Sequence, residues 1–168
     1  MRPGHDQGII PAGCVLAEDS DGKIVPYAVV SGEEMTGLVN GTNKVFTHTS
    51  ASAPLLPGSI VVAHGEIELT DNGHGVIGGT GGSGTVDYAT GVISVTFDAA
   101  PAEESGSPEV EVARAVVGVA LRPADTSRED VVSVVVHGTV LKSSLVIGVA
   151  AGDITQAAVD ALAHLAIY

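Results

Sequence analysis

The chain has 168 residues, of which 45% are hydrophobic and only 3% aromatic, so Val, Ala, Leu and Ile must build its core. Its formal charge of −13, with 7 basic residues, argues against binding to nucleic acid or to an anionic membrane, since both depend on Lys and Arg. The single cysteine, Cys14, excludes an internal disulfide and a multi-cysteine zinc site.

The chain begins with a polar segment without periodicity, residues 1–8 (MRPGHDQG), which we expect to be a flexible arm. This segment lacks the apolar stretch of a secretory signal, and no apolar run reaches the roughly 18 residues that span a bilayer. We therefore expect a soluble protein made in the cytoplasm. Two strand candidates follow at residues 14–17 and 24–30, joined by a turn at Gly22. Residues 31–34 form a polar break.

The middle of the chain, residues 35–112, consists of short strands separated by turn signals. Ile67 and Leu69 alternate with polar residues, and the run from Val92 to Phe97 alternates in the same way, which places one face on a core. Regular short strands of this kind predict an immunoglobulin-like β-sandwich. The strands are expected at residues 44–49, 59–63, 66–70, 84–88 and 92–97.

The last part of the chain returns to longer apolar runs, at residues 109–121 and 131–136. A closing amphipathic helix is predicted after Asp153, a plausible N-cap with Gln156 three residues later. We therefore predict a mainly β fold with a short C-terminal helix. One outer domain, residues 9–34 and 113–168, is interrupted by an inserted module at 35–112. The apolar stripe of the helix comprises Ile154, Ala158, Ala161, Leu162 and Leu165.

The sequence offers no catalytic constellation. The glycine-rich run at residues 78–84 lacks the lysine of a phosphate-binding loop and predicts a flexible loop between strands. Cys14 lies in an apolar setting and is expected to be a small buried side chain rather than a nucleophile. The paired carboxylates are all expected to be solvated in polar loops; they are Glu33–Glu34, Glu103–Glu104 and Glu129–Asp130.

The histidines are scattered and form no pair with metal-ligand spacing. His74 near Asp71 could form a metal pair, but polar residues at a hairpin tip are usually solvated. His137 follows an apolar strand and is expected to have a structural role, and His164 is expected on the closing helix, off its apolar stripe. We therefore predict a protein without enzymatic activity, cofactor or metal, whose role is binding or structural.

The outer parts of the chain resemble the bacteriophage lambda-type head decoration proteins. The matching stretches are IIPAGCVLA…GKIVPYA and VVGVALRPADTS…VVSVVVHGTVLKSSL…DITQAAVDALAHLAIY. The family's Gly-x-Val step corresponds to His137–Val140, followed by Leu145 and the tail 166–168. The middle of the chain is similar to a β-sandwich module of tailed-phage structural proteins, through NKVFT, PGSI, DNGHG and GTVDYATGVISVTF. Lambda-type decoration proteins typically lack this insert.

The resemblance implies a homotrimer on the outer surface of the expanded capsid, at threefold and quasi-threefold positions, that stabilises the head against packaged DNA. The implied partner is the major capsid protein, and the implied location is the virion, after synthesis in the bacterial host cytoplasm. The implied contact is the N-terminal arm, through Arg2, Pro3, His5, Asp6 and Gln7.

Two alternatives stay open. The chain could be another virion component, from a baseplate, neck or tail, that uses the same β module. It could also be a small hydrolase or lectin, or more generally a carbohydrate-binding or cell-surface-binding module, and the insert is a candidate for a host-surface or glycan ligand.

Overall fold

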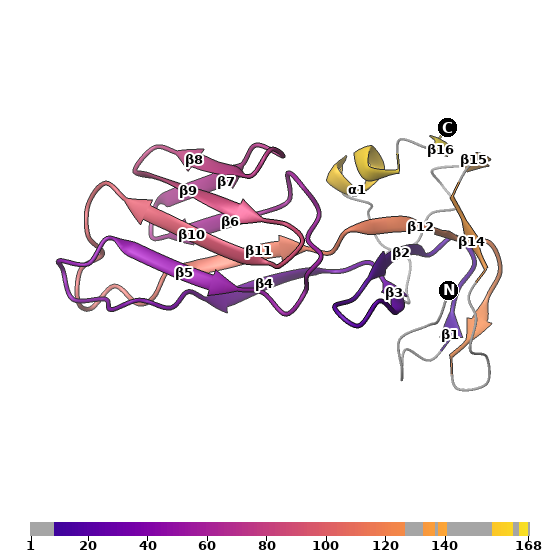
Figure 1. Cartoon of the computed structure of the whole chain (residues 1–168), viewed down its shortest axis with the longest axis horizontal. Coiled ribbons are helices and arrows are strands. Elements are labelled where there is room, and N and C mark those ends of the chain that lie inside the picture. The colour runs from indigo at the N-terminus through magenta and orange to yellow at the C-terminus, as the bar shows by residue number, and fades with distance from the viewer. Residues whose placement is uncertain (1–8, 127–132, 137, 141–155, 163–164, 168) are drawn as a thin grey trace. The chain divides into compact units, whose positions relative to one another are not determined.

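The computed structural model describes residues 9–126, 133–136, 138–140, 156–162 and 165–167. The chain divides into two compact units (Figure 1). Unit 1 combines Met1–Ala28 with Arg114–Tyr168, and unit 2 is the continuous segment Val29–Ala113. The described residues are mainly β-strand, with one short helix near the C-terminus, as the sequence predicts.

Unit 1 is built by strands from both ends of the chain. Its four-stranded sheet has the order β14 (Val134–Val135), β12 (Val116–Ala120), β2 (Val15–Glu18) and β3 (Ile24–Pro26). The central pair, β2 and β12, is antiparallel, with Leu16 opposite Gly118. This pairing joins the two separated segments of unit 1. Its core contains Ile10, Cys14, Leu16, Ile24, Ala120 and Ala124.

Two small strand pairs complete the described part of unit 1. The first is antiparallel and joins β1 (Ile9–Ile10) to β13 (Ala124–Asp125). The second is parallel and joins β15 (Gly138–Val140) to β16 (Leu165–Ile167).

The closing helix, α1 (Gln156–Ala161), is shorter than the sequence predicts. Leu162 is fully buried, in agreement with the predicted apolar stripe. The assignment of Leu165 to the helix is wrong, because this residue begins β16 and pairs with Gly138. A short isolated helix has only marginal stability. Pairing with β15 gives the backbone N–H and C=O groups of β16 hydrogen-bond partners instead. The predicted cap, Asp153, and His164 lie outside the described residues.

No helix among the described residues is long and apolar enough to cross a membrane.

Unit 2 is one antiparallel sheet of eight strands, in the order β4-β11-β6-β7-β8-β9-β10-β5 (Figure 1). The sheet curls into a nearly closed, barrel-like form, in which a bridge between Thr36 and Thr47 links the regions of its two edge strands. The turn spacing predicts a sandwich of two sheets. In the structure, hydrogen bonds join all eight strands into a single sheet. The strands are β4 (Val29–Glu34), β5 (Val45–Thr49), β6 (Val61–His64), β7 (Ile67–Asp71), β8 (Val76–Gly79), β9 (Gly82–Asp87), β10 (Val92–Phe97) and β11 (Glu109–Ala113).

The interior of unit 2 is lined by the alternating residues that the sequence indicates. Ile93, Val95 and Phe97 on β10 are buried, whereas Val92 is exposed. Leu69 on β7 is also fully buried. Phe46 and Phe97 pack edge to face, with ring centroids 5.8 Å apart. The predicted alternation of β7 and β10 is therefore confirmed.

The division between the units differs from the boundaries expected at residues 34 and 113. The strand expected at residues 24–30 is interrupted, because β3 ends at Pro26 and β4 begins at Val29 in the other unit. The expected polar break at 31–34 is itself part of β4, which pairs with β11. Polar residues suit this strand, because much of it faces outward in a curled sheet.

The glycine-rich run is not a flexible loop, as expected, but a tight β8–β9 hairpin that turns at Thr80 and Gly81. Its glycines allow neighbouring backbones to approach closely. A Cβ on Gly84 would lie 2.3 Å from the carbonyl oxygen of Ser94, and one on Gly79 would lie 2.5 Å from that of Glu68. The run therefore has a packing role.

Candidate functional site

The predicted capsid-binding residues, Arg2, Pro3, His5, Asp6 and Gln7, lie outside the described residues. The structure does describe the strand that follows them. In β1, Ile10 is fully buried in the core of unit 1 and pairs with Ala124, whereas Ile9 is 64% exposed. The backbone is therefore anchored in unit 1 directly after the segment expected to be an arm.

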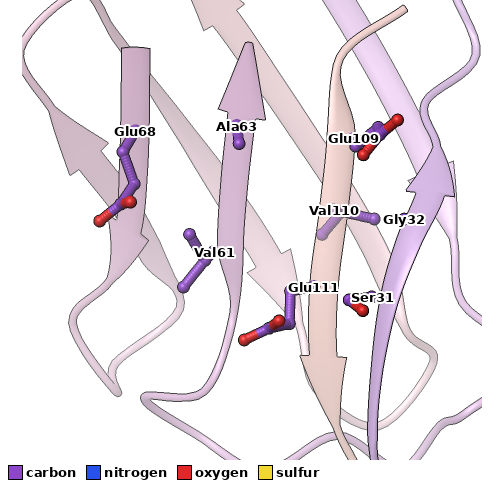
Figure 2. A pocket seen from close by; sticks show the side chains of 8 residues that line it. All are labelled: Ser31, Gly32, Val61, Ala63, Glu68, Glu109, Val110 and Glu111. Carbon is purple, nitrogen blue, oxygen red and sulfur yellow. The ribbon is translucent and has the colours of Figure 1, made fainter. Parts of the chain in front are cut away.

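A hollow of about 330 Å³ lies on the outside of the unit 2 sheet, and three of its lining residues are glutamates (Figure 2). Four neighbouring strands, β4, β11, β6 and β7, contribute to its lining. Glu68, Ala63, Glu109 and Glu34 are successive cross-strand partners in one row. The lining residues are Ser31, Gly32, Val61, Ala63, Glu68, Glu109, Val110 and Glu111.

A β-bulge between β4 and β11 shapes one side of this hollow. The register shifts between Val110 and Val112, so Ser31 and Gly32 together lie opposite Glu111. Gly32 has a φ of +75°, in the left-handed region that glycine adopts without strain. The glycine also leaves room beside the carboxylate of Glu109, which a Cβ would approach to 4.0 Å.

The hollow carries negative charge that unit 2 does little to compensate. Residues 29–113 contain eleven Asp and Glu but a single basic residue, Lys44, for a formal charge of −10; unit 1 accounts for the remaining −3. The ammonium of Lys44 donates to the carbonyl oxygen of Asp98, away from the hollow. The row of glutamates can accept hydrogen bonds and attract cations, and its carboxylates are open to solvent.

Among the described residues, the arrangement nearest to a catalytic one lies between β4 and the end of β5. Glu33 Oε2 is 3.1 Å from His48 Nε2 and accepts a hydrogen bond of 3.0 Å from Ser50 Oγ. In a hydrolytic triad the histidine takes the proton of the serine. Here both contact the same carboxylate oxygen, and Ser50 is only 3% exposed. This arrangement suits a structural link rather than a nucleophile.

The prediction that Glu33 is solvated in a loop is therefore wrong. It lies on β4, with its side chain 24% exposed and bonded to two partners. The sequence carried little signal for this cluster, because Glu33 and His48 are fifteen positions apart and meet only where the sheet curls. Glu103 and Glu104 do lie in an exposed loop, as predicted, and Glu129 and Asp130 lie outside the described residues.

Asp71 and His74, considered together as a metal pair, have separate partners. Asp71 is buried and accepts hydrogen bonds from the backbone of Gly58 and Gly73 and from the Tyr88 hydroxyl. His74 is exposed, with Nδ1 3.0 Å from the carbonyl oxygen of Asn72. Among the described residues, no group of three or more His, Cys, Asp and Glu side chains is placed to hold a metal ion.

Tyr88 and Cys14 both have pKa values raised by burial. For Tyr88, desolvation and its hydrogen bond to Asp71 raise the pKa to about 12. For Cys14, desolvation raises the pKa of the thiol to about 11, and the side chain is fully buried. The prediction of a buried cysteine is confirmed, and a thiol needs to be accessible and ionised to attack. His137 lies outside the described residues.

Comparison with known proteins adds no relative, since no family model, curated protein or solved structure matches the chain.

Proposed function

We propose that the chain is a structural virion protein that binds the outer surface of an expanded phage capsid as a homotrimer. In this proposal it occupies threefold and quasi-threefold positions, contacts the major capsid protein and stabilises the head against packaged DNA. It acts without catalysis or a cofactor. The observation that carries the proposal is the divided chain, in which the two segments that resemble decoration proteins are those that form unit 1.

Unit 1 would be the decoration domain, and unit 2 would be the added phage β module in the form of a curled single sheet. Two features support this division of roles. Val29 and Ala113, the first and last residues of unit 2, are paired on neighbouring strands, as expected for a module inserted into a loop. The buried Ile10 also fixes the strand that follows the N-terminal segment. An arm anchored in this way can add to an exposed strand edge on a capsid.

The charge distribution suits this role. Unit 2 carries −10 of the formal charge, which opposes non-specific binding to nucleic acid. Many copies on one shell raise the overall avidity of binding, so the affinity of a single arm for the capsid can be modest.

The test is to mix the purified protein with empty expanded capsids and measure occupancy by electron microscopy, with mass measurement in solution for the oligomer. The full chain should decorate threefold sites as trimers, and a variant lacking residues 1–8 should stay trimeric but lose occupancy. A variant with residues 29–113 replaced by a short Gly/Ser linker is the control and should still bind.

Equal occupancy with and without residues 1–8 would contradict the role of the arm. Rings of another symmetry, without binding to heads, would favour a baseplate, neck or tail component. Binding to a glycan array without capsid binding would favour a cell-surface role.

A further inference from the structure

Unit 2 contains two Asn-Gly steps, Asn40–Gly41 in the loop before β5 and Asn72–Gly73 in the turn between β7 and β8. In such a step the glycine N can attack the side-chain carbonyl carbon of the asparagine, because glycine has no Cβ to hinder the approach. Both asparagine side chains are exposed. The two reacting residues are the same at both steps, so a difference in their reactivity in the folded chain arises from their surroundings.

The reaction needs no partner other than water. The glycine N gives up its proton and forms a bond to Cγ of the asparagine, and the carboxamide nitrogen takes up a proton and leaves as ammonia. The resulting succinimide ring adds one water molecule at either of its carbonyl groups and opens to aspartate or to isoaspartate. The rate depends on the hydrogen-bond partner of the glycine N–H and on the donors around the carboxamide oxygen, where negative charge develops.

At Asn72 the fold holds the glycine N–H against a carboxylate. Gly73 N donates to Asp71 Oδ1 at 3.0 Å. The same carboxylate accepts hydrogen bonds from the Tyr88 hydroxyl and from Gly58 N, and it is buried. Loss of the proton from Gly73 N would place a second negative charge beside Asp71, where water screens it poorly. The first step of the reaction is therefore opposed at this site.

At Asn40 the glycine N–H is held by a neutral group. Gly41 N donates to the carbonyl oxygen of Pro101 at 3.0 Å. Gly41 is exposed, and a Cβ on it would meet nothing within 4 Å, whereas one on Gly73 would lie 3.9 Å from Gly58 N. Opening of this one hydrogen bond therefore gives water and hydroxide access to Gly41 N, without an anion beside it.

Three donors also converge on the carboxamide oxygen of Asn40. Thr42 N, Thr42 Oγ1 and Asn43 N lie 3.0, 2.9 and 2.8 Å from Asn40 Oδ1. These distances fall within the range of donors that stabilise a developing oxyanion. Asn72 Oδ1 accepts from two backbone N–H groups, at 2.8 and 3.3 Å, so the second contact is weaker. The charged intermediate is therefore stabilised better at Asn40.

We propose that Asn40 is a site of spontaneous conversion to aspartate and isoaspartate in the folded protein, and that the fold protects Asn72 from the same reaction. Either product adds one negative charge to unit 2. Isoaspartate also lengthens the backbone by one methylene group in the loop that leads into β5. The modified fraction grows with the age of the protein and requires no enzyme.

The test is incubation of the full-length protein in a mildly alkaline buffer, followed by proteolysis and mass spectrometry of the peptides that contain Asn40 and Asn72. The same chain in concentrated urea is the control, and there the two sites should convert at similar rates. In the native chain Asn40 should convert about tenfold faster than Asn72, because a hydrogen bond to a charged acceptor is harder to break than one to a neutral acceptor. Equal native rates would overturn the proposal. So would an unmodified Asn40 after the denatured chain has reacted.

Two substitutions test the causes separately, and each leaves the other site as its control. Asp71→Asn removes the charge but keeps an oxygen that can accept from Gly73 N, so conversion of Asn72 should rise towards that of Asn40. Thr42→Val removes one donor to Asn40 Oδ1 at nearly constant side-chain shape, so conversion of Asn40 should slow by about fivefold. If D71N leaves the rate at Asn72 unchanged, the protection by charge is refuted. If D71N does not fold, the comparison of native and denatured wild type still decides the proposal.

Discussion

Val29 and Ala113 are direct partners in the antiparallel pair of β4 and β11, although 83 residues lie between them in the chain. Both connections to unit 1 therefore leave unit 2 from adjacent strand ends. Cα atoms of such partners lie roughly 4.5–5.5 Å apart. Backbone pairing within unit 2 therefore holds its first and last residues together.

The first prediction is that residues 29–113 fold when they are produced alone. The fragment keeps all eight strands and the unit 2 core around Phe46, Leu69 and Val95. We expect a cooperative thermal transition and dispersed amide NMR signals that overlay those of unit 2 in the full chain. A fragment that starts at residue 35 is the comparison and should be less stable, because it lacks β4. Loss of structure in the 29–113 fragment would show that unit 1 is required.

The second prediction concerns the glycine-rich hairpin. Gly84→Ala should destabilise unit 2 by about 1–3 kcal/mol, because the new Cβ would collide with the carbonyl oxygen of Ser94. Gly78→Ala is the matched control from the same run, since a Cβ there meets nothing within 4 Å. It should change stability by no more than about 0.5 kcal/mol. Urea unfolding of both variants measures the difference, and equal effects would contradict a packing role.

The third prediction uses the raised pKa of Tyr88. Tyr88→Phe should cost about 1–2 kcal/mol at pH 7, because Gly75 N loses its acceptor and Asp71 loses a donor. The folded state keeps Tyr88 neutral up to a pKa of about 12, against 10 for the unfolded chain. Its contribution is therefore complete below pH 10 and is lost as pH rises towards 12. The difference in unfolding free energy between wild type and Y88F should shrink over that range; a constant difference would contradict it.

The fourth prediction concerns the row of glutamates. Glu109 and Glu34 are directly opposite, and like charges in that position destabilise a sheet. Glu109→Lys should stabilise unit 2 by about 0.2–1 kcal/mol at low salt, and 1 M salt should remove most of the gain. Glu104→Lys, in the exposed loop, is the control and makes the same change in net charge. An equal gain from both would indicate a general charge effect.

The sequence was informative where a single strand carries its own pattern. Residues 92–97 were predicted with the bounds observed for β10, because apolar and polar side chains alternate over its whole length. The buried Cys14 was predicted from its local apolar setting, and the buried Leu162 from the apolar stripe of the closing helix. β8 was missed because Val76 and Ile77 are followed directly by glycines, which favour turns in a single sequence.

Local sequence patterns could not predict which strands pair with one another. β11 lies between β4 and β6, and this order creates both the glutamate row and the bulge at Gly32. No spacing in the chain indicates that Glu68, Glu109 and Glu34 share one row. The contact of Glu33 with His48 also depends on how far the sheet curls. The main surface features of unit 2 therefore arise from tertiary structure and could not be read from the sequence.

The partnership of Val29 with Ala113 also bears on the order of folding. In unit 1, Leu16 must find Gly118 across most of the chain before β2 and β12 can pair. If unit 2 folds first, its paired ends shorten the effective loop by about a factor of six, which lowers the closure cost by roughly 1.5 kcal/mol. The strands of unit 2 are mostly joined by short turns, so its contacts form earlier. Prior folding of unit 2 would therefore bring the two chain segments of unit 1 close together in the chain's effective length and favour the pairing of β2 with β12.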